Sequence, residues 1–177
     1  QGRRLCAAGL EAESRYQVHV LSGLGARNGS SLANAHHAEV LTRARPASAD
    51  FASQGSFLPA TLAAGLPVRV MNVDELGVDY FHVPPARISE FLRHAYNSRG
   101  WSAWEFARNE QFSAHVFRGR YALNNPRNKS TTFTLPLADV PELTARPGLY
   151  LAVLDVIGQY STHNHPVTWF TVTDLGL

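Results

Sequence analysis

Four histidines of this 177-residue chain have spacings that could bring imidazoles to a metal ion. His163 and His165 form an H-x-H pair, and His36 and His37 are adjacent. A structural zinc site needs four ligands and a catalytic one about three. The sequence offers neither a pair of cysteines nor an H-E-x-x-H pattern to supply the missing ligands. We therefore interpret these histidines as solvated, and we predict no metal ligand and no cofactor.

No arrangement of residues predicts a catalytic nucleophile. The chain lacks a G-x-S-x-G pattern, and its single cysteine, Cys6, has no obvious base beside it. Asp74 and Glu75 could form a carboxylate pair, but two acidic residues in a short segment between strands are typical of a solvated turn. We expect no catalytic residue and no enzymatic activity.

Large aromatic side chains are concentrated in one region. The stretch RGWSAWEFAR contains Trp101, Trp104 and Phe106, and the helical pattern before it contains Phe91 and Tyr96. Such side chains supply large buried areas to cores and interfaces, and stacking on sugars or nucleic-acid bases is the alternative. We favour packing, and we take these five residues as candidate contacts with a neighbouring domain or a partner.

Composition narrows the class of protein. Hydrophobic residues make up 45% and charged residues 17% of the chain, as in a folded domain. The formal net charge is +2 with the basic residues scattered, so we expect no nucleic-acid partner. No run approaches the roughly 18 apolar residues of a membrane helix, and the first residues, QGRRLCAAGL, lack the apolar core of a signal peptide.

The elements that must position any site are short segments in which apolar and polar residues alternate. YQVHVL, for example, places Tyr16, Val18 and Val20 on one face, and Gln17 and His19 on the other. Alternation of this kind, interrupted by turn residues, indicates an all-β protein with an antiparallel β-sandwich of the immunoglobulin or fibronectin-III type. The segments expected to be strands are 16–21, 38–43, 66–72, 78–83, 112–119, 131–137, 149–156 and 166–173.

One segment has a helical period, and three have turn signals. Residues 86–97 carry apolar side chains at helical spacing, with Pro85 in the first turn, which predicts one short helix. Asn28-Gly29 predicts a hairpin turn, and 123–130 an exposed loop. Pro147-Gly148 predicts a type II turn.

The stretch RARPASAD, residues 43–50, has the composition of a linker. Only about two convincing strands precede it, and two strands are too few to be stable alone. We therefore expect residues 1–45 to be the C-terminal strands of an upstream domain, and residues 46–177 to be one complete domain.

Several stretches, in order, resemble a macroglobulin-like domain of the bacterial alpha-macroglobulins. They are NVDELGVDYFHVPPARISEFL, FRGRYALNNPRNKSTTFTLPLADV, RPGLYLAVLD and WFTVTDLGL. In that family such a domain opens with an apolar strand leading to Leu-Pro, as Phe57-Leu58-Pro59 does here. It closes with a Ser/Thr-Asp-Leu/Ile-Gly-Leu sequence, as residues 173–177 do. The stretch CAAGLEAESRYQVHVLSGLGARNGSSLA is similar to the final strands of the preceding macroglobulin-like domain.

The resemblance implies a structural module of a large protease-trapping inhibitor in the periplasm, attached to the inner membrane through the parent chain. In this family a cleaved bait segment triggers rearrangement of the domains, and many members capture the protease with a Cys-x-Glu-Gln thioester. Cys6 is followed by Ala7-Ala8-Gly9, so it is not that thioester, and no loop is identified as the bait. The implied partners are neighbouring macroglobulin-like domains, target proteases and a peptidoglycan synthase.

Two further hypotheses come from the residues alone. An adhesin-like or carbohydrate-binding sandwich would use Trp101 and Trp104 as a stacking platform. An enzyme domain would use His163 and His165 on a metal.

Overall fold

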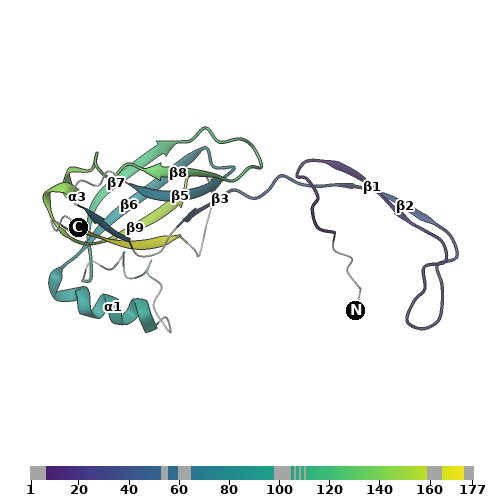
Figure 1. Ribbon diagram of the computed structural model, residues 1–177, viewed down its shortest axis with the longest axis horizontal. Helices are drawn as coiled ribbons and strands as arrows, with labels where there is room; N and C mark the ends of the chain where they lie inside the picture. Colours follow the sequence, from purple (N-terminus) through teal and green to yellow (C-terminus); the bar gives the residue numbers. More distant parts are fainter. Residues whose placement is uncertain are drawn as a thin grey trace. The chain divides into compact units, whose positions relative to one another are not determined.

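The structure, a computed structural model, describes residues 7–52, 56–59, 65–97, 105, 107, 109, 111–158 and 165–173. The chain forms two compact units, Gln1–Arg45 and Pro46–Leu177. Figure 1 labels most of the elements of the two units.

Unit 1 is built on an antiparallel hairpin. Strand β1 (Arg15–Val20) pairs with β2 (His36–Leu41), with His19 directly opposite His37. The predicted turn at Asn28-Gly29 is confirmed: Gly29 has φ +82°, and the backbone N–H of Ser30 donates to Asn28 Oδ1 at 3.2 Å. Positive φ costs glycine little because it has no Cβ.

Unit 2 contains two sheets, and the predicted β-sandwich is confirmed (Figure 1). The larger sheet has the order β4 (Ser56–Pro59), β10 (Val167–Thr173), β9 (Gly148–Val156), β6 (Glu75–Val83) and β7 (Ala114–Ala122). The smaller sheet has the order β3 (Ser48–Phe51), β5 (Leu66–Met71) and β8 (Thr131–Leu135). Pairing is antiparallel except between β4 and β10, and the layout matches strands A, B and E facing strands G, F and C of an immunoglobulin domain.

The main core lies between the two sheets. Because side chains alternate across a strand, every second residue of β6 and β9 points inward, and the same holds for β5. Tyr80 of β6 is fully buried, with its ring centroid 6.0 Å from that of Phe170 on β10. The fully buried inward residues include Leu76, Ala152, Leu154, Val68, Leu135 and Tyr150.

A second apolar cluster lies on the outer face of the larger sheet. The predicted helix is confirmed as a 3-10 turn, η1 (Pro85–Arg87), that continues into α1 (Ile88–Asn97). Phe91 of α1 packs with Phe81, Leu151 and Val153 of the sheet, so the helix covers part of the outer face (Figure 1). We call this the outer apolar cluster.

The connection into β9 differs from the prediction. Gly148 begins β9 with φ +158°, whereas a type II turn requires about +80° at that position, so the predicted turn is wrong. The chain instead forms a short helix, α3 (Pro141–Ala145), that the sequence analysis missed. The Tyr150 hydroxyl closes this corner by donating to the carbonyl oxygen of Arg146 at 2.5 Å. A tyrosine at the start of strand F bonded to upstream backbone is a hallmark of immunoglobulin-like sandwiches.

Candidate functional site

The aromatic residues predicted as contacts fall into three groups. Trp101, Trp104 and Phe106 lie outside the described residues, and Tyr96 lies in α1 without a described side chain. Phe91 is 2% exposed in the outer apolar cluster, so the contact that the structure shows for it is with the sheet of its own unit. The role of these residues in contacts between domains stays a prediction.

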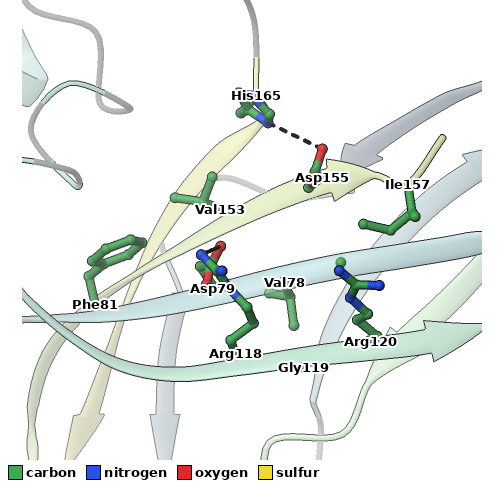
Figure 2. Close-up of a pocket in the computed structure, with 11 residues that line it drawn as sticks. Val78, Asp79, Phe81, Arg118, Gly119, Arg120, Val153, Asp155, Ile157 and His165 are labelled. Carbon is green, nitrogen blue, oxygen red and sulfur yellow. Dashed lines mark hydrogen bonds and ion pairs between the residues drawn. The ribbon is translucent and has the colours of Figure 1, made fainter. Parts of the chain in front are cut away.

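Unit 2 has a hollow of about 260 Å³ on the outer face of the larger sheet, next to the outer apolar cluster (Figure 2). Its floor is the sheet itself, at Gly77 and Val78 of β6 and Gly119 of β7. Charged side chains surround that floor; they are Asp79, Arg118, Arg120, Asp155 and His165.

Asp79 is the centre of the charges on one side of this outer-face hollow. Arg118 Nε lies 2.6 Å from Asp79 Oδ1 and Arg118 Nη2 lies 3.2 Å from Oδ2, a bidentate pair. His115 Nε2 lies 2.7 Å from the same Oδ1. The hydrogen bond and then the charge of Asp79 raise the pKa of Arg118 above its ordinary value. The carboxylate is therefore held by two cationic or donor groups of the next strand.

A β-bulge explains how both partners reach Asp79. Residues 115 and 118 are three apart, so a regular strand would place them on opposite faces. Tyr80 pairs with Phe117 and Phe81 pairs with His115, which leaves Val116 as the extra residue. One inserted residue reverses the alternation beyond it. The bulge thus brings His115 to the same face as Arg118.

The other side of the hollow has weaker pairs. His165 Nδ1 lies 3.1 Å from the carbonyl oxygen of Leu154 and 3.7 Å from Asp155 Oδ1, the contact drawn in Figure 2. The His165 side chain is 19% exposed, so it is not the solvated loop histidine that the sequence analysis expected. Arg120 Nη1 lies 3.7 Å from Glu75 Oε1.

This arrangement suits a contact surface better than chemistry. The charges pair within the sheet, and the described part of the chain contains no group of three or more His, Cys, Asp or Glu that could hold a metal ion. Exposed pairs of this kind contribute at most about 1 kcal/mol each, so they orient side chains more than they stabilise the fold. Sequence reasoning missed Asp79 and Arg118, because their pairing depends on strand register.

Two packed, mostly antiparallel sheets define the class of protein as a macroglobulin-like β-sandwich. Residues 50–170 match the bacterial alpha-2 macroglobulin MG2 domain, and the chain therefore belongs to the bacterial alpha-2-macroglobulin family. The alpha-2-macroglobulin of Escherichia coli (strain K12) is 33% identical over 168 residues, which cover 95% of this chain and 10% of that protein. The chain thus spans about a tenth of the length of this relative.

Solved structures of E. coli alpha-2-macroglobulin are similar to the chain. The native conformation determined by cryo-EM has a TM-score of 0.66 at 31% identity, covering 93% of this chain and 10% of that one. The crystal structure spanning domains MG0-NIE-MG1 has a TM-score of 0.61 at 33% identity, covering 94% and 52%. The crystal structure spanning NIE-MG1 has a TM-score of 0.59 at 36% identity, covering 73% and 62%.

No helix within the described ranges is long and apolar enough to cross a bilayer.

Proposed function

We propose that this chain is a structural, non-enzymatic module of a protease-trapping inhibitor that protects the bacterial cell envelope. The observation that carries the proposal is the match of residues 50–170 to the bacterial alpha-2 macroglobulin MG2 domain. The relatives are bacterial proteins named alpha-2-macroglobulin, which supports an inhibitor as the parent protein. The proposed location is the periplasm, where the target proteases and a peptidoglycan synthase are the proposed partners of the parent.

The module would act by presenting its surfaces rigidly. Three aromatic rings pack together between the two sheets. Phe170 contacts both Tyr80 and Tyr150, and its ring centroid lies 5.6 Å from that of Tyr150. A core packed to this degree resists deformation, so strain released elsewhere in the parent moves the sandwich as a body. The outer-face hollow and the loops are then available to dock neighbouring domains.

We propose that residues 1–45 are the final strands of an upstream macroglobulin-like domain and that residues 46–177 form a complete one. Unit 1 leaves one face of its hairpin apolar, with Val18 36% and Val40 40% exposed, as expected of strands whose partner sheet belongs to another part of the parent. The match to the E. coli structure that includes MG0 covers 94% of this chain, and the match to the one without MG0 covers 73%. The difference between these two coverages is close to the share of the chain that unit 1 makes up.

The five aromatic residues are proposed contacts with neighbouring domains or partners. Replacing Trp101 and Trp104 together with Ala in the parent is expected to weaken docking of the module more than its own stability. The measurement is thermal unfolding of the isolated chain together with assembly of the parent. Lower stability of the chain with unaltered assembly would assign both residues to the core.

The proposed function is tested on the full-length parent with a substoichiometric broad-specificity protease. Size, shape and retained protease are followed together, with this chain alone as the control. A single cut that compacts the parent and retains the protease, while this chain traps nothing, supports the proposal. Degradation of the parent without a change of shape contradicts it, and glycan binding by the chain would then favour the carbohydrate-binding module.

A further inference from the structure

The hairpin of unit 1 brings together two histidines that are 18 positions apart in the sequence. His19 of β1 and His37 of β2 are a directly opposed cross-strand pair. Their Nδ1 atoms lie 2.8 Å apart, their ring centroids are 4.5 Å apart, and the rings are nearly perpendicular. Both residues are exposed, and they line a hollow of about 290 Å³ together with Gln17, Ala38 and Glu39. We propose that this pair chelates a divalent transition-metal ion, with Cu²⁺ preferred.

The distance between the two nitrogens fits chelation. With metal–nitrogen bonds of about 2.0–2.1 Å, two nitrogens 2.8 Å apart subtend about 86° at the ion. That angle suits the tetragonal geometry of Cu²⁺ or Ni²⁺, whereas a tetrahedral zinc ion would need the nitrogens about 3.3 Å apart. Imidazole ligands suit copper, nickel and zinc, and Cu²⁺ is the tightest-bound of the divalent first-row ions. The geometry therefore favours Cu²⁺ and Ni²⁺ over Zn²⁺, and the order of affinities favours Cu²⁺ over Ni²⁺.

Gln17 helps to orient the first ligand. His19 Nε2 lies 3.4 Å from Gln17 Oε1, an oxygen that can only accept a hydrogen bond. A proton on Nε2 leaves the lone pair of His19 on Nδ1, which faces His37. Second-shell hydrogen bonds of this kind fix the tautomer of histidine ligands. The two Nδ1 atoms now share one hydrogen bond, in which His37 donates and His19 accepts. To bind the ion, neutral His37 moves its proton from Nδ1 to Nε2 and the two exposed rings turn so that both Nδ1 lone pairs converge on the ion, and the step releases no proton.

The surroundings add charge but no third ligand. Glu39 lies on the same face, two pairs along the ladder, and its carboxylate lies 3.4 Å from Arg15 Nε. No third His, Cys, Asp or Glu joins the pair in the described part of unit 1, so water would complete the coordination. The site is on the polar face of the hairpin, opposite the face that carries Val18 and Val40. It would remain accessible if another sheet covered the apolar face.

Chelation would also stabilise the pairing of β1 with β2. An isolated two-stranded sheet is marginally stable in water, and an ion held by one ligand from each strand binds only when the strands are paired. Such an ion stabilises the pairing by mass action. The expected consequence is slower amide hydrogen exchange in β1 and β2 when Cu²⁺ is present.

The test is a calorimetric titration of the tag-free 177-residue chain with Cu²⁺ in a buffer that chelates weakly. One equivalent is expected to bind, and electron paramagnetic resonance should show two imidazole nitrogens. H19Q and H37Q each remove one of the two linked ligands and are expected to weaken binding about tenfold or more. His36 is the matched control because it lies on the opposite face of the same strand, so H36Q should leave the affinity unchanged.

Two outcomes would overturn the proposal. One is binding to H37Q that is as tight as binding to the unmodified chain, which would place the copper on other groups such as the N-terminal amine. The other is an equal loss of affinity in H36Q. Backbone NMR distinguishes a local loss of a ligand from unfolding. Cu²⁺ is expected to broaden the signals of residues 17–19 and 37–39. In H19Q and H37Q this broadening should disappear, while the chemical shifts of unit 2 stay in place.

Discussion

Tyr80 and Tyr150 are fully buried tyrosines of the same core, but their hydroxyls differ. The Tyr150 hydroxyl donates to the carbonyl of Arg146, whereas the Tyr80 hydroxyl has no hydrogen-bond partner in the described residues. Burial raises the pKa of both phenols above the ordinary value, first through desolvation. A buried hydroxyl without a partner has lost its water without compensation.

The two hydroxyls predict opposite results for the same substitution. Tyr150→Phe should lower the free energy of unfolding by about 1–2 kcal/mol, because it removes a hydrogen bond that closes the corner. Tyr80→Phe should leave it unchanged or raise it, since no bond is lost. Urea denaturation of both variants measures this. Equal destabilisation by the two substitutions would show that the Tyr80 hydroxyl has a partner.

His82 predicts a pH dependence of stability. The side chain is 2% exposed, and its burial, followed by the charge of Arg146, lowers its pKa below the ordinary value of 6.5. The unfolded chain therefore binds more protons than the folded chain just below pH 6.5. The contribution of neutral His82 is present above pH 6.5 and is lost as the pH falls through the lowered pKa.

The expected result is a fall in the free energy of unfolding from pH 7.5 to pH 5.5 that is smaller in His82→Gln, whose side chain does not titrate. Denaturant unfolding at several pH values measures both slopes. The comparison cancels the contribution of the other histidines to the pH dependence, because both proteins contain them. Parallel curves for the two proteins would mean that His82 titrates normally in the folded state.

At the scale of elements, helix α1 depends on a few apolar side chains. Phe91 is almost fully buried against Phe81 and Leu151, whereas Arg93 on the same helix is exposed. Phe91→Ala is expected to lower the free energy of unfolding by about 3 kcal/mol, through lost burial and the cavity left behind. Arg93→Ala is the control and should change it by less than about 0.5 kcal/mol.

Thermal unfolding of both variants measures the difference, and hydrogen exchange locates it. Exchange in 88–97 is expected to accelerate before exchange in β9, because the core between the sheets does not include Phe91. A small loss of stability in Phe91→Ala, similar to that in Arg93→Ala, would show that the helix does not rely on this contact.

At the scale of the whole molecule, the outer face of the larger sheet has two parts. One part carries the outer apolar cluster and is covered by α1, and the other carries the hollow around Asp79 and Arg118. Helix α1 of the same unit therefore already covers the apolar part. The second is an accessible polar surface, which is the kind of surface that domains in one chain use for contacts that can rearrange.

The division into two units predicts how fragments behave. Residues 46–177 expressed alone should unfold cooperatively, with a midpoint within a few degrees of the same unit in the full chain, because both core clusters lie within it. Residues 1–45 alone should show little stable β-structure. Circular dichroism and calorimetry measure both. A stable fold of residues 1–45 would contradict the proposal that they are part of a larger domain.

The sequence by itself determined the class of fold. Local alternation predicted β5, β6, β8, β9 and β10 to within a few residues, and helical periodicity predicted α1, because these periods come from the geometry of the backbone. The resemblance to the bacterial alpha-macroglobulins is confirmed over residues 50–170. Short elements such as β3 and α3 were missed. Four or five residues are too few to show a clear hydrophobic periodicity, and such elements are held by tertiary contacts.

Only the tertiary structure decided which side chains meet. The His19–His37 pair needs the register of the hairpin, and the contacts of His115 and Arg118 with Asp79 need a bulge. Both are set by the partner strand, and a shift of one residue would move each side chain to the other face. The hydrogen bond of Tyr150 likewise depends on the path of the chain through α3. Pairing across strands is non-local, so the sequence of one strand does not contain it.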